Sequence, residues 1–282
     1  MKKDQLAEAT IKATGRKLRH LAKSCNLDIP EDVKEYLANK KGKNGYIESL
    51  VDTYNRYVIY NGLTWKKPRI KRTSQPPYVP TTEEISILIA DAGKKYALIF
   101  SMFRDGGFRP IEMERMTLRW IDLNRGKVNV ETAKHGLGRT IKLKESTAAM
   151  LKEYVIKNNF RLDDRLFPRT KTMQRMMCHA RRSSATKLKR PELEKISLYS
   201  FRHYFASMLY HKTRDYLHVK KQLGHRRIEQ TITYIHQIYD SYEDNDFTTA
   251  TATTVKEARQ LLENGFDYKL EIDGVKIFRK RK

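Results

Sequence analysis

The hydrophobic pattern of this chain has helical spacing over most of its length and changes to a two-residue period in two short stretches. Residues 127–134 and 139–143 alternate on either side of the small-residue segment HGLG, which predicts a strand, a turn and a second strand. Residues 268–278 alternate around Asp273-Gly274, a pair that favours a hairpin turn. The pattern therefore predicts a mainly α fold with a small β-sheet or hairpin, in the α+β class.

A segment rich in proline and basic residues, 66–80, predicts an exposed linker and divides the chain. Before it, residues 1–65 have helical spacing and predict a small helical domain, which either binds DNA through its basic residues or acts as a helical cap. Residues 81–246 are long enough for the main domain. Residues 247–282 predict a helix and the second hairpin, and we expect this tail to contact another protomer or DNA.

Two motifs mark helix starts near the beginnings of the main domain and the tail. Thr81-x-x-Glu84 and Thr254-x-x-Glu257 have the capping-box pattern. In this pattern the hydroxyl accepts a hydrogen bond from a backbone N–H, and the carboxylate accepts one from the backbone N–H of the cap residue. A helix is therefore expected to begin at each motif.

The charge balance indicates a polyanionic partner. There are 57 Lys and Arg residues against 33 Asp and Glu, a formal net charge of +24, and residues 161–190 form a strongly basic run. We expect double-stranded DNA, since the charge is spread along the chain and not gathered on one membrane-binding helix. The DNA contacts that we expect are Lys66, Lys67, Arg69, Lys71, Arg72, Arg139, Arg181 and Arg182.

The sequence gives no indication of a membrane span, a disulfide or a metal site. No stretch approaches the roughly 18 consecutive apolar residues of a membrane span, and the N-terminus lacks an apolar signal core, so we expect a cytoplasmic protein. Cys25 and Cys178 lie far apart in unlike surroundings and are expected to be reduced thiols. No carboxylate cluster suited to a divalent metal stands out, and we expect neither metal nor cofactor.

Three segments carry residue types that suit the cutting and rejoining of a phosphodiester without a metal. This chemistry needs a nucleophile, cations on the non-bridging oxygens and a proton donor for the leaving oxygen. In GGFRPIEMERMTL, Arg109 follows two glycines and precedes Glu112 by three residues. In the predicted hairpin, Lys134 lies at the end of a strand, five residues before Arg139.

The third segment is LYSFRHYFASML, followed by QLGHRRIEQTITYIHQ. Arg202 and His203 lie on an otherwise apolar helix, His225 ends the next helix in an L-G-H sequence, and Tyr234 follows nine residues later. An arginine suits a phosphate clamp because its planar fork stays charged and can bond two oxygens together. Each residue alone also fits a structural role, but their order and spacing together favour a catalytic site.

These segments resemble the tyrosine recombinases, or phage-type integrases, over about residues 80–240. The family has an arginine in G-x-R-x-x-E, a hairpin lysine, H-x-x-R-H, L-G-H and a tyrosine about nine positions later, and GFRPIE, FRHYFAS and LGH match these patterns. The resemblance implies a tyrosine-recombinase catalytic domain preceded by a domain like the family's core-binding domain. Its implied catalytic residues are Arg109, Lys134, Arg202, His225 and Tyr234, supported by Glu112, Asp122 and His203.

The mechanism that the resemblance implies is site-specific recombination for a mobile genetic element, without metal or ATP. Tyr234 attacks the scissile phosphodiester and forms a 3′-phosphotyrosine bond, while Lys134 protonates the leaving 5′-oxygen. Arg109, Arg202 and His225 bind the phosphate. Strand exchange is then expected in a tetramer of protomers on two DNA sites.

One position departs from the family pattern. The family usually has histidine three residues before the second arginine, whereas this chain has Tyr199. A phenol can donate a hydrogen bond to phosphate, but its reference pKa of about 10 makes it a poor base at neutral pH. Archaeal members of the family vary at this position, so we keep Tyr199 among the catalytic candidates as a hydrogen-bond donor.

Two alternative functions use the same basic surface. A type IB topoisomerase-like enzyme would relax plasmid DNA that has no special site, although L-G-H favours the integrase. A non-enzymatic DNA-binding protein would bind without forming a covalent adduct. Covalent capture of DNA by Tyr234 separates the second alternative from the recombinase.

Overall fold

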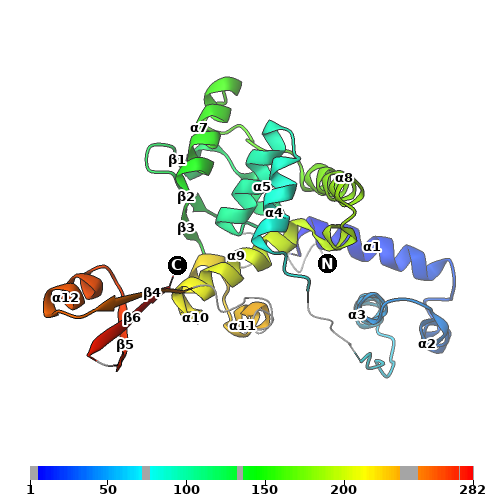
Figure 1. Ribbon diagram of the computed structural model, residues 1–282. Helices are drawn as coiled ribbons and strands as arrows, with labels where there is room; N and C mark the ends of the chain where they lie inside the picture. The colour runs from blue at the N-terminus through cyan, green and yellow to red at the C-terminus, as the bar shows by residue number, and fades with distance from the viewer. Residues whose placement is uncertain (1–5, 72–76, 132–135, 236–246, 273, 282) are drawn as a thin grey trace. The chain divides into compact units, whose positions relative to one another are not determined.

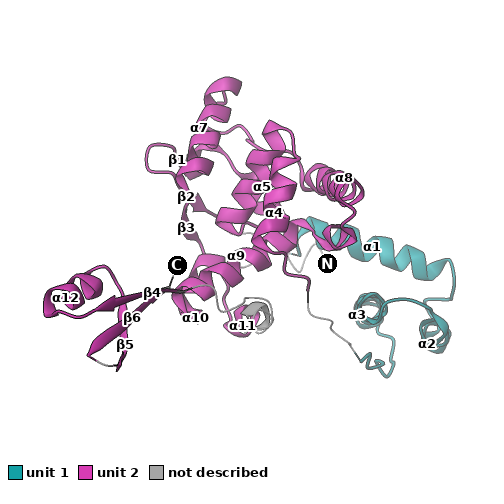
Figure 2. Cartoon of the chain, viewed as in Figure 1, with its two compact units in different colours: residues 1–75 teal, residues 76–282 magenta. Residues whose placement is uncertain are grey.

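The computed structural model describes residues 6–71, 77–131, 136–235, 247–272 and 274–281. The chain divides into two compact units, Met1–Gln75 and Pro76–Lys282 (Figure 2). No helix in the described part of the chain is both long and apolar enough to cross a membrane.

The first unit consists of three helices, α1 (Glu8–Ala22), α2 (Pro30–Asn39) and α3 (Asn44–Tyr60) (Figure 1). Pro30 occupies the first position of α2, where its missing N–H leaves no hydrogen bond unmade. Leu21 of α1 packs with Tyr54 of α3 in a small apolar core. The Tyr54 hydroxyl donates to the carbonyl of Leu27 at 2.9 Å, which fixes the loop before α2.

The segment after α3 packs against this unit through a few partly buried apolar side chains, while the lysines and arginines of the expected linker, residues 66–71, are exposed. Trp65 and Ile70 lie against the small core, and the Trp65 ring meets Tyr54 edge to face at 4.7 Å. Lys67 forms an ion pair with Asp52 at 2.7 Å. The reason is that apolar side chains alternate with the cations here, so one side of the segment is buried while its charges stay in solvent.

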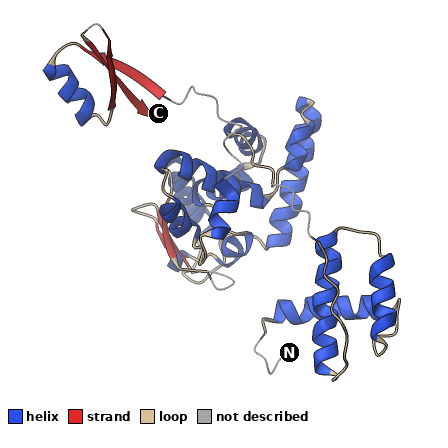
Figure 3. Ribbon diagram, turned by 90° about the horizontal axis from the view of Figure 1, so that it is seen from below, coloured by secondary structure: helices blue, strands red, loops and turns tan. Residues whose placement is uncertain are grey.

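The second unit is mainly helical (Figure 3). Its helices are α4 (Thr82–Ala90), α5 (Lys94–Gly106), α6 (Pro110–Arg115), α7 (Glu145–Asn158), α8 (Thr170–Leu188), α9 (Leu198–Thr213), α10 (Tyr216–Leu223), α11 (Glu229–Ile235) and α12 (Val255–Glu263), with the 3-10 turns η1 (Leu118–Trp120) and η2 (Pro191–Lys195). Helix α5 contacts α4, α7 and α9. Phe100 and Phe103 of α5 meet Phe201 of α9 at ring distances of 5.9 and 6.4 Å. Phe201 is the residue before Arg202, so this aromatic contact anchors the helix that carries Arg202.

A three-stranded antiparallel sheet follows α6, in the order β1 (Ile121–Asp122), β2 (Lys127–Val130) and β3 (Arg139–Lys142). The two predicted strands are confirmed as β2 and β3, whereas residues 132–135, the end of the first predicted strand and the start of the turn, lie outside the described residues. The short β1 was not predicted. Val128 pairs with Ile141, and both are buried in the main core. The two-residue period therefore places one face of the sheet against the helices and exposes Lys127 and Lys142 on the other.

The tail forms a second antiparallel sheet, in the order β4 (Phe247–Ala252), β6 (Val275–Arg281) and β5 (Asp267–Ile272). Gly274 adopts a φ of +76° in the turn between β5 and β6, as the Asp-Gly signal predicts. Helix α12 contacts β4 and β5, and Phe278 of β6 is buried. Strand β4 was missed because FTTATA has threonine and alanine where a clear apolar and polar alternation would signal a strand.

Both capping boxes are confirmed. Thr81 Oγ1 accepts from the backbone N–H of Glu84 at 3.2 Å, and the Glu84 carboxylate accepts from the Thr81 N–H at 2.8 Å. Glu84 also accepts from the Tyr78 hydroxyl at 2.6 Å. The box at Thr254 has the same two bonds.

Replacing Thr81 by alanine is expected to lower the free energy of unfolding by about 1 kcal/mol, since one backbone N–H loses its acceptor. Urea denaturation of the full chain measures this change. Ser183→Ala, at an exposed position of α8, is the control and should change stability by less than about 0.5 kcal/mol. Equal stability of Thr81→Ala and wild-type protein would show that the cap contributes nothing.

Candidate active site

The turn between α5 and α6 places Arg109 at the edge of the site. Gly107 adopts a left-handed φ of +54°, and a Cβ at this position would lie 2.4 Å from the Phe205 ring. Only glycine fits both the conformation and the space. The chain can therefore reverse directly after α5, and Arg109 becomes the residue before α6 with Pro110 in its first turn.

The carboxylate of Glu112 is shared by two arginines. It accepts from the backbone N–H of Arg109 at 2.8 Å and from Arg109 Nη1 at 2.7 Å. It also accepts from Arg139 Nη1 at 3.2 Å and Nη2 at 2.8 Å. Glu112 is fully buried, and burial opposes its ionisation, but the hydrogen bonds and charges of these arginines prevail and lower its pKa to about 2. Glu112 is therefore an ionised carboxylate that pairs with both Arg109 and Arg139.

Arg202 of α9 lies at the centre of the site and is 1% exposed. Its Nη1 donates to the carbonyl of Gly107 and its Nη2 to the carbonyl of Leu223, both at 2.5 Å. Nη2 also lies 3.1 Å from His225 Nε2. These three acceptors are uncharged groups that satisfy hydrogen bonds of the buried guanidinium.

His225 connects Arg202 to helix α11. Its Nδ1 lies 3.0 Å from Thr231 Oγ1, and Thr231 is fully buried. A guanidinium can only donate, so His225 Nε2 accepts from Arg202 and the neutral ring carries its proton on Nδ1, facing Thr231. Burial, followed by the charges of Arg202, Arg109 and Arg139, lowers the pKa of His225 to about 3. The ring is therefore neutral at pH 7.

The end of the β2–β3 loop lies against the turn that carries His225. The backbone N–H of Leu137 donates to the carbonyl of Gly224 at 3.3 Å. Gly224 has a φ of +63°, and a Cβ there would lie 2.6 Å from the Leu137 carbonyl oxygen. The L-G-H sequence therefore ends α10 and also leaves room for the hairpin.

The other predicted catalytic residues are placed as follows. Tyr199 lies in the first turn of α9 and is 48% exposed. Tyr234 lies on α11, but its side chain is outside the described part of the structure, as is all of Lys134. His203 of α9 is partly buried, and burial, then the charge of Arg202, lowers its pKa to about 4.

Asp122 does not support Arg109 in the way that we expected. Its carboxylate accepts from the backbone N–H groups of Asn124 and Arg125, at 3.1 and 3.0 Å, and so closes the turn between β1 and β2. This is the usual local bond of an aspartate at a turn.

Two of the arginines that we expected to contact DNA, Arg139 and Arg181, form hydrogen bonds within the protein. Arg139 is buried against Glu112, so its guanidinium is not on the surface. Arg181 donates through Nη1 to the carbonyl of Ile196 at 2.7 Å and joins α8 to the segment before α9. Arg72 lies outside the described residues. Exposed side chains are found at Lys66, Lys67, Arg69, Lys71 and Arg182.

Sequence reasoning missed Thr231, because a threonine within a helix usually has no role beyond its own turn. Its position three residues before Tyr234, on the same face of α11, was the available signal. Thr231 joins His225 to the helix of the proposed nucleophile.

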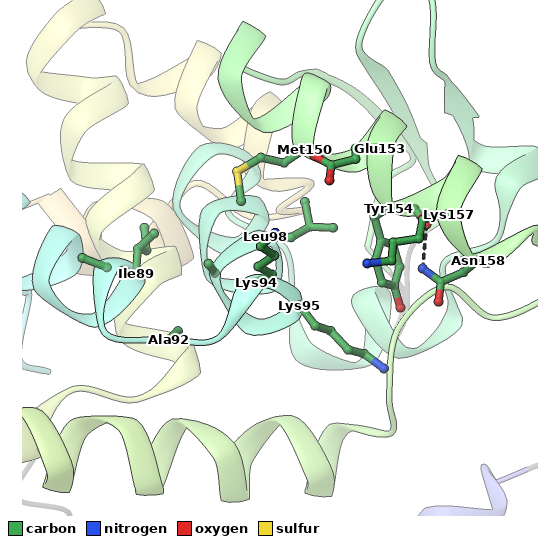
Figure 4. A pocket seen from close by; sticks show the side chains of 12 residues that line it. Ile89, Ala92, Lys94, Lys95, Leu98, Met150, Glu153, Tyr154, Lys157 and Asn158 are labelled. Carbon is green, nitrogen blue, oxygen red and sulfur yellow. Dashed lines mark hydrogen bonds between the residues drawn. The ribbon is translucent and has the colours of Figure 1, made fainter.

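A separate cavity of about 540 Å³ lies between the α4–α5 turn and α7 (Figure 4). Ile89, Leu98 and Met150 form its apolar wall, and Lys94 is at its edge. The residues that line it do not include those of the cluster around Arg202, which consists of Arg109, Glu112, Arg139, Arg202 and His225. Among the described residues, no group of three or more His, Cys, Asp and Glu side chains could hold a metal ion.

The fold and the cluster of Arg109, Arg139, Arg202, Glu112 and His225 together suit an enzyme that acts on a phosphodiester. The phage integrase family matches residues 81–240, more than half of the chain. The chain therefore belongs to the phage integrase family, and it is a site-specific recombinase of the tyrosine type. The expected family and the expected fold class are both confirmed.

Relatives and solved structures agree with this assignment. Tyrosine recombinase XerA of Saccharolobus solfataricus is 24% identical over 221 residues, which cover 76% of this chain and 71% of the relative. A lambda integrase dimer bound to a COC′ core site has a TM-score of 0.67 at 16% identity, over 85% of this chain and 92% of that one. The Tn1549 transposon integrase in complex with transposon right end DNA has a TM-score of 0.65 at 16% identity, over 92% and 94%. These two structures share the fold with this chain.

Stability is expected to fall as the pH decreases from about 6.5 towards 4. The folded state lowers the pKa of His225 to about 3 and that of His203 to about 4, from the ordinary value of 6.5. Across this window the unfolded chain therefore binds more protons than the folded one, so acid favours unfolding. Urea denaturation at pH 7.5, 6.0 and 5.0 measures the slope.

His225→Gln should reduce the slope of unfolding free energy against pH, because it removes one of the two histidines whose pKa is lowered in the folded state. The control is His179→Gln, at an exposed position of α8, which should leave the slope unchanged. A wild-type stability that is independent of pH over this window would contradict the buried, neutral state of both histidines.

Proposed function

We propose that this recombinase cleaves and rejoins DNA through a covalent bond between Tyr234 and the 3′-phosphate of the cut strand. The observation that supports this most directly is the buried chain of contacts from Arg109 through Glu112 to Arg139, and from Arg202 through His225 to Thr231 on the helix of Tyr234. The arginines and the histidine that we propose at the phosphate thus lie on helices and turns that these contacts hold together.

The charges of this site suit a phosphodiester that gains charge during reaction. Arg109, Arg139 and Arg202 contribute three positive charges, Glu112 contributes one negative charge, and His225 is neutral. The cluster therefore carries an excess of two positive charges. A phosphodiester has one negative charge, and a second develops as the nucleophile adds to phosphorus. Cations held in place before the reaction stabilise this charge without reorganisation.

The proposed reaction conserves the phosphodiester bond energy. The Tyr234 hydroxyl gives its proton to a water molecule as its oxygen bonds to phosphorus, while the bond to the 5′-oxygen breaks and that oxygen takes a proton from Lys134. Attack by the 5′-hydroxyl of a partner strand reverses these steps and releases Tyr234. The neutral His225 accepts from Arg202 and so helps to hold the guanidinium in the site. Tyr199 is proposed as a hydrogen-bond donor near the phosphate.

We also propose a double-stranded recombination site as the partner, with a homotetramer on two such sites. The structures of similar fold include an integrase in complex with transposon right end DNA and an integrase dimer bound to a core site. The exposed cations of residues 66–71 and of α8 would bind the phosphate backbone. The tail, residues 247–282, is proposed to contact DNA or a neighbouring protomer, and the chain to act in the cytoplasm.

Covalent capture tests the proposed nucleophile. The substrate is a nicked duplex that has been selected from a random-sequence pool by covalent retention on the wild-type protein. Wild-type protein should form the adduct in the presence of a chelator, whereas Tyr234→Phe should bind the duplex and form none. Arg202→Ala should slow cleavage at least about 100-fold, the scale for the loss of one fixed transition-state donor. An adduct with Tyr234→Phe, or no adduct with wild-type protein, would refute the proposal.

Tyr199→Phe should slow cleavage by the equivalent of about 0.5 to 3 kcal/mol, the range for one hydrogen bond that includes a charged partner. Its 48% exposure leaves the hydroxyl accessible to DNA. Tyr199→His should keep or raise the rate near neutral pH. Single-turnover cleavage of the selected duplex measures both variants, with Tyr60→Phe, at another exposed tyrosine, as the control. An unchanged rate in Tyr199→Phe would exclude a direct contact.

A further inference from the structure

We propose that Arg139 is a positioning residue that keeps the positive charge of Arg109 available to the scissile phosphate. This inference rests on the proposed function, because it assigns a role within the same cleavage reaction. It replaces the expectation that Arg139 contacts DNA.

Arg139 is committed to the protein interior. It is the first residue of β3, paired with Val130 of β2, and its side chain is 1% exposed. Both of its terminal nitrogens donate to the Glu112 carboxylate, in the bidentate geometry that is the strongest for this pair. A buried ion pair needs such geometry to offset the loss of hydration of both groups.

The sharing of Glu112 determines the charge that Arg109 presents. Glu112 accepts from Arg109 Nη1 at 2.7 Å and from Arg139 Nη2 at 2.8 Å. With both arginines in place, the three groups carry a net charge of +1. Without Arg139, the carboxylate would have Arg109 as its remaining ionic partner in this set, and the pair would be neutral. Arg139 therefore prevents Glu112 from cancelling the charge of Arg109.

Arg139 also touches the opposite side of the site. A Cβ at Gly224 would lie 3.3 Å from Arg139 Nη1 and 3.4 Å from its Cδ, so the arginine packs against this turn. Leu137, two residues earlier, donates its N–H to the Gly224 carbonyl. The next residue, His225, bonds to Arg202. One side chain thus sets the distance between the Arg109 segment and the histidine turn.

The experiment compares two versions of the selected nicked duplex. One has the natural phosphodiester at the cleavage position, and the other has a methylphosphonate, in which a methyl group replaces one charged non-bridging oxygen. Arg139→Gln should bind both duplexes within about 3-fold of wild-type protein. It should cleave the phosphodiester at least about 30-fold more slowly, as befits a lost electrostatic stabilisation. The methylphosphonate lacks one charged oxygen, so its cleavage needs less positive charge. Arg139→Gln should therefore cleave it less than about 5-fold more slowly than wild-type protein.

A double variant keeps the test independent of folding. Glu112→Gln together with Arg139→Gln removes the carboxylate that would otherwise cancel Arg109 and leaves no unpaired buried charge at this position. We expect it to cleave the phosphodiester faster than Arg139→Gln alone, by about 5-fold or more. If Arg139→Gln alone does not fold, the double variant is compared with wild-type protein. Cleavage of the phosphodiester by the double variant that is more than about 30-fold slower than by wild-type protein would overturn the proposal.

The matched control is Arg119→Gln, which removes an arginine paired with Asp163 at an exposed position. It should cleave both duplexes at the wild-type rate. Equal losses on both duplexes in Arg139→Gln, or no loss on the phosphodiester, would overturn the inference while leaving the proposed function intact. A wild-type protein that forms no adduct would refute the proposed function itself.

Discussion

The hydrogen bonds of Arg202 are the interaction on which the rest of the site depends. This buried guanidinium bonds to the carbonyl of Gly107 at the end of α5, to that of Leu223 at the end of α10, and to His225. Helix ends leave carbonyl groups without intrahelical partners, and the arginine satisfies two of them. Three segments far apart in the sequence are joined in this way, and their joint position fixes the geometry of the proposed phosphate site.

Glycine at two helix ends makes this arrangement possible. Gly107 and Gly224 both adopt left-handed backbone conformations, and each is closely covered, by Phe205 and by Leu137 respectively. A side chain at either position would push the covering segment away. The site therefore depends on space as much as on charge: the absence of two Cβ atoms allows the carbonyls, the hairpin and the histidine to approach one another.

The sequence predicted the elements of the site better than their contacts. Local spacing was sufficient for the Arg109 and Glu112 pair, the hairpin and the L-G-H turn, since each is determined within a few residues. The burial of Arg139 was not predictable, because its partner Glu112 lies 27 residues away and a basic residue beside a turn is usually solvated. The packing of Ile70 was likewise not predictable, because it lies among the cations of the expected linker, and Thr231 lies among the ordinary residues of a helix.

The strand order of the tail has a consequence for how this region can form during synthesis. The middle strand of its sheet, β6, follows both of its neighbours in sequence, and β4 and β5 each pair with it and not with each other. Until β6 has left the ribosome, neither neighbour has its backbone partner in this sheet. The tail sheet can therefore assemble only after the segments that bear Arg109, Arg202 and His225 have emerged, so its formation cannot precede their synthesis.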